Sequence, residues 1–144
     1  MPEPNYTMPD LTLVGEDHIR AYRETGGEAG YIWNGVPTLL LTVTGRRTGR
    51  QLTSALIFGR DGDDYLVVAS KGGWPQHPSW YLNLQANPQA NIQVEAEALA
   101  VVARTASSEE KPRLWKVMTD LWPNYDAYQS RTDRDIPVVV LTPT

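Results

Sequence analysis

The stretch TLLLTVTGRRTGRQLTSALIF, residues 38–58, decides the fold of this chain. Its first six residues, at 38–43, are apolar or β-branched and predict a buried strand. The residues at 52–58 alternate in polarity and predict a second strand. Between them, the glycine-punctuated segment TGRRTGRQ predicts a turn. Two strands joined by so short a connection are expected to pair in antiparallel fashion.

Hairpin connections dominate the rest of the chain as well. The residues DGDD at 61–64 predict a tight hairpin turn. Further strands are expected at 65–69, 90–95, 98–105 and 136–142, and helices at 16–28, 79–86 and 107–122, the last opened by a capping-box pattern at Ser107 and Glu110. No long alternation of strands and helices occurs. The pattern therefore favours an α+β protein with a mostly antiparallel sheet, closed as a small barrel.

The composition is that of one ordinary globular domain. The chain has 144 residues, of which 41% are hydrophobic, enough for a single core. Residues 1–15 hold three prolines and few apolar side chains, so they are expected to form a flexible arm, and residues 16–144 a single domain. The absence of cysteine excludes disulfides, thiolate metal sites and cysteine nucleophiles.

Charge and hydropathy restrict the partners and the location. The net charge of −4 argues against a nucleic-acid partner. Basic residues are nevertheless concentrated at Arg46, Arg47 and Arg50, which favours a small anionic ligand over a polyanion. No apolar run approaches the ~20 residues of a membrane span, and the N-terminus lacks the regions of a signal peptide. We therefore expect a cytoplasmic protein with no integral membrane segment.

Few side chains suit direct catalysis. The only two histidines, His18 and His77, have no metal-ligating partner at helical spacing, so no metal site is expected and a catalytic role is disfavoured for both. No serine lies in a nucleophile elbow. An enzyme that lacks its own nucleophile, metal and acid–base pair usually takes its chemistry from a cofactor.

Three short segments have the composition of a cofactor site. The turn at 45–50 combines backbone N–H groups with arginine side chains, which suit a phosphate or carboxylate. The residues SKGG at 70–73 permit a close backbone approach to a flat ring, and the helix start at 78–80 offers free N–H groups. Taken alone, the basic turn at 45–50 is explained about equally well as a solubilising hairpin and as an anion-binding site. Taken alone, the segment at 70–73 is explained better as an ordinary turn than as a ligand site. Their coincidence favours a ligand.

Aromatic residues gather in the C-terminal third of the chain. Trp115 has helical spacing and is expected in the core. The pair Trp122-Pro123 breaks the helix, so Tyr125 and Tyr128 are expected in or near a loop. Tyrosines placed there can form the wall of a pocket for a flat apolar substrate.

Several motifs occur together in a specific order. They read T-x-T-G-R-R-T-G at 42–49, V-V-A-S-K-G-G at 67–73, P-S-W-Y-L-N-L-x-A-N-P at 78–88, W-P-x-Y-x-x-Y-Q at 122–129 and R-x-I-P-V-V-x-L at 134–141. From about residue 38 to its end, the chain resembles the deazaflavin-dependent nitroreductase family. These are split β-barrel proteins, best known from actinobacteria, that use reduced coenzyme F420. The resemblance implies hydride transfer from the reduced deazaflavin to a conjugated small-molecule acceptor, namely an unsaturated lactone, a quinone or a nitro-aromatic.

The resemblance also implies the residues of the site. Tyr125 and Tyr128 would face the substrate, with Tyr125 assisting protonation and Ser70 binding the acceptor oxygen. Trp74 and Tyr31, outside the motifs, are further candidates for contact with the substrate, and Trp33 is a further candidate for the pocket wall. The cofactor would be held by the basic turn (Arg46, Arg47, Thr48, Arg50), the strand after it (Leu52, Thr53, Ser54, Ala55, Leu56, Ile57), the end of the third strand (Val68, Ala69, Ser70, Lys71, Gly72) and the helix start (Ser79, Trp80, Tyr81, Leu82, Asn83).

The chain departs from the family pattern at two positions. Leu52 and Ala55 stand where the family often has an arginine and a proline, and Arg50 is expected to supply the missing charge. Two other functions stay open: a related barrel that binds flavin mononucleotide (FMN), and a carrier that holds F420 without turnover. Fold analogy also suggests a homodimer. Peripheral contact with a membrane is left open, although residues 1–15 are neither basic nor amphipathic enough to argue it.

Overall fold

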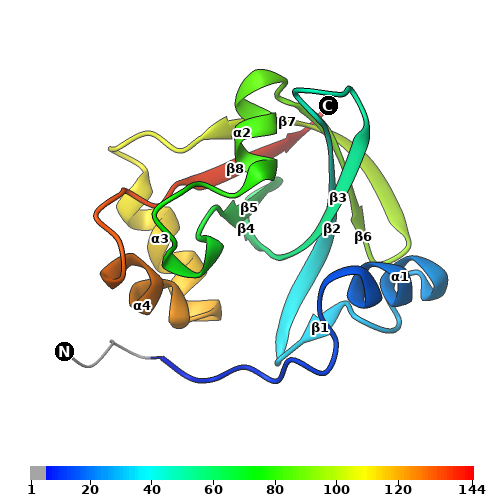
Figure 1. Cartoon of the computed structure of the whole chain (residues 1–144), viewed down its shortest axis with the longest axis horizontal. Coiled ribbons are helices and arrows are strands. Elements are labelled where there is room, and N and C mark those ends of the chain that lie inside the picture. The colour runs from blue at the N-terminus through cyan, green and yellow to red at the C-terminus, as the bar shows by residue number, and fades with distance from the viewer. Residues whose placement is uncertain (1–5) are drawn as a thin grey trace.

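The computed structural model describes residues 6–144 as a curled antiparallel sheet with helices at its ends (Figure 1). The strands are β1 (Ile32–Trp33), β2 (Val36–Thr44), β3 (Gln51–Ile57), β4 (Gly59–Asp61), β5 (Asp64–Val68), β6 (Gln89–Val94), β7 (Glu97–Thr105) and β8 (Val138–Pro143). The helices are α1 (Gly15–Thr25), α2 (Ser79–Ala86), α3 (Lys111–Leu121) and α4 (Asn124–Ser130), with a 3-10 turn, η1, at Lys71–Gly73. The strand order is β1-β2-β6-β7-β8-β5-β4, with β3 also paired to β2. The α+β class and the antiparallel sheet are confirmed.

The sheet curls into a half-barrel and stays open. Within residues 6–144, β3 pairs only with β2, and β4 pairs only with β5. The chain crosses between these two edges at Phe58, whose N–H bonds to the carbonyl oxygen of Pro37 at 3.2 Å. The expected full closure is therefore wrong, and the split form of the barrel is confirmed. The open side leaves one edge of β3 without a partner strand.

The hairpin predicted from residues 38–58 is present as β2 and β3. Its pairs run from Thr38 opposite Ile57 to Thr44 opposite Gln51. Alternation along β2 sends Leu39 and Leu41 into the barrel core, while Leu40 packs on the other face against α1. A central strand covered on both faces needs the continuous apolar run that the sequence shows there.

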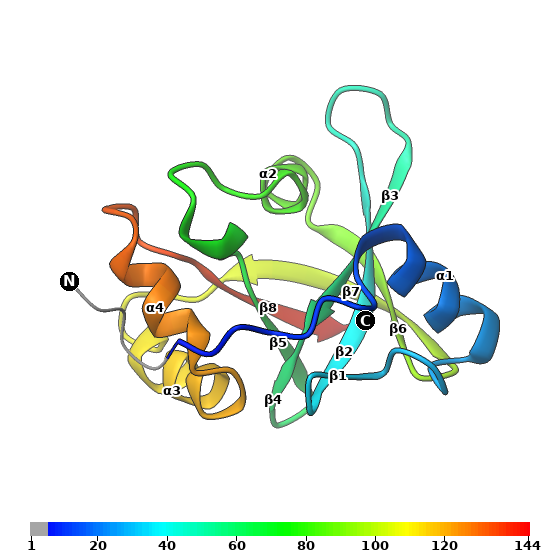
Figure 2. The same ribbon diagram turned by 60° about the horizontal axis from the view of Figure 1, so that its bottom comes forward.

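A second core lies between the sheet and the two C-terminal helices (Figure 2). The buried side chains of Leu114 and Met118 in α3 pack against those of Leu66 and Val140 in β5 and β8. Close approach requires a glycine at 59, where a Cβ atom would lie 2.7 Å from the Met118 sulfur. This packing fixes α3 and α4 against the end of the sheet.

The C-terminal helices differ from the prediction. The helix expected at 107–122 begins at Lys111 and ends at Leu121. Both bonds of the capping box are present, because Ser107 N–H donates to the Glu110 carboxylate and Glu110 N–H to Ser107 Oγ. The loop expected around Tyr125 and Tyr128 is wrong: those residues form α4, since Pro123 ends one helix and has the φ that starts the next.

The segment 6–14 passes from α4 to α1 without forming a helix or strand (Figures 1 and 2). Thr7 exchanges two hydrogen bonds with the Asn124 side chain, each of 2.7 Å, and Trp33 Nε1 donates to the Leu13 carbonyl oxygen. The remainder of the predicted arm, residues 1–5, lies outside the described residues. Within residues 6–144, no helix has the length and hydropathy needed to cross a membrane.

Tyr22 connects α1 to the sheet. Its side chain is fully buried, and its hydroxyl donates to the Thr38 carbonyl oxygen at 2.9 Å while accepting the N–H of Glu95 at 2.8 Å. Burial raises the pKa of Tyr22 to about 12. In the unfolded chain a tyrosine ionises near pH 10. The folded state therefore loses stability as the pH rises through the window between these two values.

Replacing Tyr22 with phenylalanine should lower the free energy of unfolding at pH 7 by about 2 kcal/mol, because the Glu95 N–H loses its acceptor. The variant should also lose part of the alkaline destabilisation, since the group that ionises on unfolding is gone. Urea unfolding of both proteins from pH 8 to 12 measures the two effects. Parallel stability curves would show that this hydroxyl does not titrate with unfolding.

Candidate functional site

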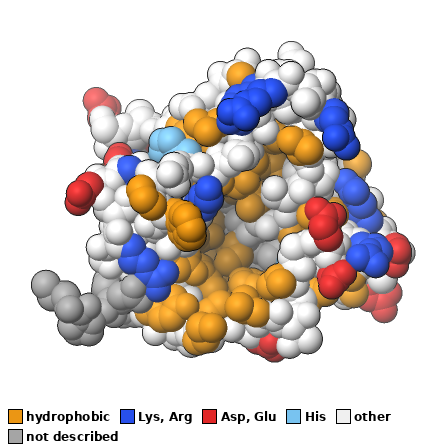
Figure 3. Space-filling model, in the orientation of Figure 1, with side chains coloured by type: hydrophobic (Ala, Val, Ile, Leu, Met, Phe, Trp, Pro, Cys, Tyr) orange, Lys and Arg blue, Asp and Glu red, His pale blue; other side chains and the backbone are white. Residues whose placement is uncertain are grey.

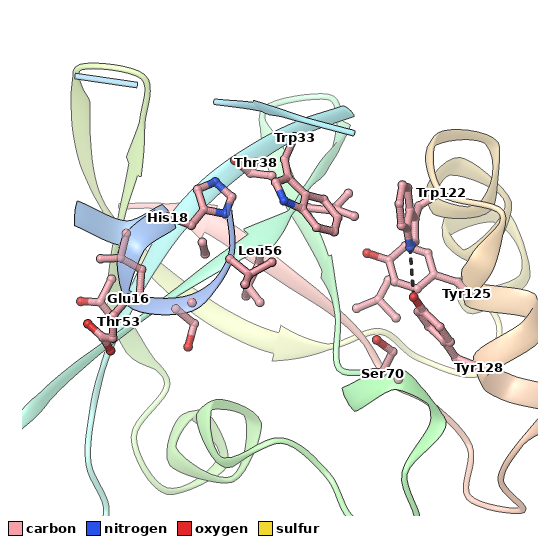
Figure 4. A pocket seen from close by; sticks show the side chains of 18 residues that line it. Glu16, His18, Trp33, Thr38, Thr53, Leu56, Ser70, Trp122, Tyr125 and Tyr128 are labelled. Atoms are coloured by element: carbon pink, nitrogen blue, oxygen red, sulfur yellow. Dashed lines mark hydrogen bonds between the residues drawn. The ribbon is translucent and has the colours of Figure 1, made fainter. Parts of the chain in front are cut away.

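A cleft of about 500 Å³ opens between β3, the start of α1, the end of β5 and α4 (Figure 4). On the surface it is the hollow in the middle of the face, bordered by hydrophobic side chains (Figure 3). Its size and its largely apolar wall are typical of small-molecule sites. It is lined by Val14, Gly15, Glu16, His18, Ile19, Trp33, Thr38, Thr53, Ser54, Ala55, Leu56, Ile57, Val68, Ser70, Gly72, Trp122, Tyr125 and Tyr128.

The open edge of β3 forms one wall of the cleft. Five consecutive residues of this strand, 53–57, line it. A strand presents alternate side chains to each face, so five in succession indicate that the cleft follows the edge of the strand. Unpaired N–H and C=O groups on such an edge are available to a bound ligand. The family resemblance predicts that this stretch contacts the cofactor.

The segment 70–73, called the elbow below, brings Ser70 and Gly72 into the cleft. Lys71, Gly72 and Gly73 have φ angles of +46°, +61° and +84°. Glycine adopts such angles at little cost, whereas lysine does not. The two glycines therefore serve the sharp bend that turns the chain from β5 toward α4.

Arg134 holds the elbow in place. Its guanidinium donates to the carbonyl oxygens of Ala69 at 3.1 Å, Ser70 at 2.6 Å and Trp74 at 2.8 Å. Its Nη1 also lies 3.1 Å from Nδ1 of His77. Burial, and then the charge of Arg134, lower the pKa of His77. The imidazole therefore accepts this hydrogen bond in its neutral form.

Two tyrosines of α4 form the wall opposite α1. The rings of Tyr125 and Tyr128 meet edge to face with centroids 6.0 Å apart, and Trp122 Nε1 donates to the Tyr128 hydroxyl at 3.4 Å. Burial raises the pKa of Tyr125 far above its usual range. Its hydroxyl thus keeps its proton and can donate a hydrogen bond to a ligand oxygen, but it is a poor source of a transferred proton.

The basic turn lies at the end of the β2–β3 hairpin and does not line the cleft. The side chains of Arg46, Arg47 and Arg50 are exposed. Asn83 Oδ1 accepts the Arg46 N–H at 3.0 Å and its guanidinium at 2.8 Å. Because the Asn83 side chain is buried in α2, this pair of bonds fixes the turn relative to the rest of the fold.

Fourteen of the predicted site residues lie outside the cleft wall. Trp80 and Tyr81 of α2 pack into the barrel core, and the Tyr81 hydroxyl bonds to Thr105 Oγ1 at 2.7 Å. Tyr31 packs against Phe58, and Trp74 is 62% exposed. The full set is Arg46, Arg47, Thr48, Arg50, Leu52, Ala69, Lys71, Ser79, Trp80, Tyr81, Leu82, Asn83, Trp74 and Tyr31.

Comparison with known proteins identifies the family. The model of a family described as F420H(2)-dependent quinone reductase matches residues 15–143. The chain belongs to this family. It is 46% identical over 129 residues to the F420H(2)-dependent quinone reductase Rv1261c of Mycobacterium tuberculosis strain H37Rv, an alignment that covers 87% of each chain.

Solved relatives of this quinone reductase family have the same fold. A structure of the F420-H2 dependent reductase FDR-A superposes with a TM-score of 0.68 and 40% identity, covering 73% of this chain and 93% of its own. A second relative, described as a domain-swapped dimer, has the same score and identity and covers 73% of this chain and 79% of its own. The resemblance seen in the sequence is thereby confirmed.

The cleft also contains residues to which no sequence motif gave a role in the site. His18, Trp33, Thr38 and Trp122 line it from α1, β1, β2 and the α3–α4 junction. Figure 4 places His18 on the side opposite Tyr125 and Tyr128, with Leu56 and Trp33 between. Only the fold brings these elements together, and spacing along the chain gives no sign of it. Of these four residues, only Trp33 is a pocket-wall candidate from the sequence, and it lies outside every motif.

Proposed function

We propose that this chain reduces a quinone with reduced coenzyme F420. One observation carries the proposal: a single cleft joins the open edge of β3 to the elbow and to the α4 tyrosines. A cofactor held along β3 and an acceptor held by Ser70 and Tyr125 would therefore lie next to each other. Holding two reactants next to each other in this way lowers the barrier to the transfer of a hydride between them.

The residues present fit the cofactor. The cleft volume of about 500 Å³ is that of a small-molecule site. Residues 53–57 and 68–72 would flank the flat deazaflavin ring. Arg46, Arg47 and Arg50 would hold its phosphate and acidic tail, since guanidinium groups bind such anions with charge-assisted hydrogen bonds. Asn83 and the core-packed residues of α2 would support this site from behind.

When bound, the reduced deazaflavin supplies a hydride to the acceptor. The protein orients the acceptor and excludes water. Tyr125 would donate a hydrogen bond to one acceptor oxygen, aided by Ser70 at the elbow. The rings of Trp33 and Trp122, whose centroids lie 5.5 Å apart, would cover the flat acceptor and keep solvent away.

Cofactor titration tests the proposal. F420 and FMN are added separately to the protein in the same buffer, and reduced F420 is then mixed with a soluble quinone while its oxidation is followed by absorbance. We expect binding of F420 in preference to FMN, and turnover with the quinone. Preference for FMN would favour the related FMN-binding barrel, and tight F420 binding without turnover would favour a carrier.

Replacing Arg47 with alanine should weaken F420 binding about tenfold, since a charge-assisted hydrogen bond contributes roughly 1.5–3 kcal/mol. The affinity of the variant should also depend less on salt. Fluorescence titration at two ionic strengths measures both. Arg113→Ala is the control, because that exposed arginine pairs with Asp61 on α3 and β4, away from the cleft. Equal affinities for wild type and Arg47→Ala would remove the phosphate-binding role.

We also propose that this chain forms a homodimer. A relative 40% identical to this chain is described as a domain-swapped dimer. A cytoplasmic location, with or without peripheral contact with a membrane that holds the quinone, also stays a proposal. Sedimentation of the purified protein, alone and with lipid vesicles, tests both.

A further inference from the structure

His18 reaches the cleft from α1 on the side opposite the α4 tyrosines (Figure 4). Only 4% of the residue is exposed. Its ring stacks on that of Trp33, with centroids 6.4 Å apart and an interplanar angle of 20°. A buried imidazole at the wall of a redox cleft raises the question of which ring nitrogen faces the substrate.

The hydrogen bond at Nε2 answers half of that question. Nε2 lies 2.8 Å from the carbonyl oxygen of Gly30, which also accepts a 2.7 Å bond from Thr38 Oγ1. A carbonyl oxygen only accepts hydrogen bonds, so Nε2 must carry a proton. The ring is held closely in this position, since a Cβ atom at residue 30 would lie 2.9 Å from His18 Cδ2.

The other nitrogen, Nδ1, has no hydrogen-bond partner within residues 6–144. In the same part of the chain, no buried side-chain nitrogen or oxygen lacks a partner. Nδ1 is therefore accessible rather than sealed in the core, and the open space that this ring lines is the cleft. The fold thus presents one polar nitrogen of a fixed imidazole to any bound acceptor.

Resting on the function proposed above, we propose that His18 is a catalytic residue whose Nδ1 binds one oxygen of the quinone and protonates it. The cleft then has polar groups at two opposite sides, with Nδ1 on one and Ser70 and Tyr125 on the other. Such a site fits a ring that carries oxygens at opposite positions, that is, a para-quinone.

The proton and electron balance supports this role. The acceptor gains a hydride from the reduced cofactor and becomes an anion whose charge develops on its oxygens. Nε2 keeps its proton for the Gly30 carbonyl oxygen, so the step uses the imidazolium form of His18, in which Nδ1 carries a second proton taken from solvent. That second proton forms an O–H bond with the nearer oxygen, which completes the hydroquinone. The imidazole is left neutral and takes a new proton from solvent. Imidazoles exchange protons readily near neutral pH, whereas burial raises the pKa of Tyr125 and makes its proton costly to transfer.

Two amide substitutions separate the two nitrogens of His18. The glutamine amide reaches the position of Nε2, so His18→Gln can keep the bond to the Gly30 carbonyl oxygen but removes the nitrogen facing the cleft. The asparagine amide reaches only as far as Nδ1, so His18→Asn can keep a polar atom toward the cleft but loses the Gly30 bond. Neither amide can transfer a proton.

Three measurements on the two variants test the role of His18. Turnover of quinone with reduced F420 should fall on the order of 100-fold in both variants, as for a lost general acid. Calorimetric binding of a hydroquinone to the protein without cofactor should weaken roughly fivefold in His18→Gln only, as for one lost hydrogen bond. Thermal stability should fall in His18→Asn only.

Failure of this inference is distinct from failure of the proposed function. Turnover within threefold of wild type in His18→Gln, with unchanged hydroquinone binding, would overturn the role of His18. If wild-type protein binds F420 but reduces no quinone, the proposed function fails. Hydroquinone binding without cofactor then decides on His18 alone: weakening confined to His18→Gln supports the cleft-facing nitrogen, and equal binding by both variants overturns it.

Discussion

Replacing Gly73 with alanine should lower the free energy of unfolding by about 3–5 kcal/mol, because a Cβ atom there would make the shortest clash at any glycine within residues 6–144. A Cβ atom there would lie 2.4 Å from the carbonyl oxygen of Tyr128 and 2.9 Å from Arg131 Cβ. The first of these contacts is with the backbone of α4, which cannot rotate aside. The positive φ of 84° adds its own cost.

The neighbouring glycine provides the matched control. Gly72 also has a positive φ, of 61°, but a Cβ atom at this position would meet nothing within 4 Å. Gly72→Ala should therefore cost about 1 kcal/mol, the price of backbone conformation alone. Urea unfolding of the two variants measures the difference. A similar loss in both would mean that α4 moves away from the elbow at little cost.

A second expectation for Gly73→Ala concerns the cleft. If the elbow shifts away from α4, Ser70 and Tyr128 must move relative to each other, and both line the cleft. Hydroquinone binding should weaken even at temperatures where the variant is fully folded. Stability and ligand binding are coupled at this point because the elbow is at once a packing surface and a wall of the site.

Local patterns in the sequence are sufficient to predict most of the fold. The β2–β3 hairpin is predictable because an apolar run, a glycine-rich turn and an alternating run follow one another within residues 38–58. The capping box at Ser107 and Glu110 is equally local. α4 was missed because the break at Pro123 indicates the end of one helix but gives no sign that another follows at once. The short strands β1 and β4 carry too few residues for a periodic signal.

The candidate site was only partly predictable, for a physical reason. The residues at 53–57 follow the basic-turn motif directly along the chain, those at 68–72 lie within a continuous motif, and most of both stretches line the cleft. His18 and Trp33 reach it from separate elements, so their position depends on how α1 and β1 dock on the sheet. Trp80 and Tyr81 show the opposite case. They lie in a motif and are predicted to contact the cofactor, but their side chains pack into the barrel core. A motif marks an important segment without telling which way each side chain points.

Arg134 shows how the core and the site are linked, and its loss should have the second largest effect. Arg134→Ala should lower the free energy of unfolding by about 3 kcal/mol, since a hydrogen bond to a charged group contributes roughly 1.5–3 kcal/mol and three carbonyl oxygens would lose one. Arg134→Lys should recover only part of this loss, because an ammonium group cannot span acceptors that a planar guanidinium reaches together.

The control for this prediction is Arg60→Ala. The Arg60 guanidinium also donates to backbone carbonyl oxygens, those of Gly62 at 3.4 Å and Asp64 at 3.3 Å. Unlike Arg134, it is exposed and lies on the β4–β5 hairpin, outside the cleft. Its removal should cost less than about 1 kcal/mol and leave ligand binding unchanged. A loss for Arg134→Ala no greater than for Arg60→Ala would show that the elbow holds its shape without the guanidinium.

The pH dependence of stability gives an independent test of the same contact. The pKa of His77 is lowered by burial first and by Arg134 second. The pKa of His77 is therefore lower in the folded chain than the value of about 6.5 expected in the unfolded chain. Below about pH 6.5 the unfolded chain binds the proton more readily than the folded chain, so stability falls as the pH decreases through that value. Removing Arg134 frees His77 from one cause of the shift. The wild-type protein should therefore lose more stability between pH 7 and pH 5 than Arg134→Ala does, and equal losses would mean that the charge of Arg134 does not act on His77.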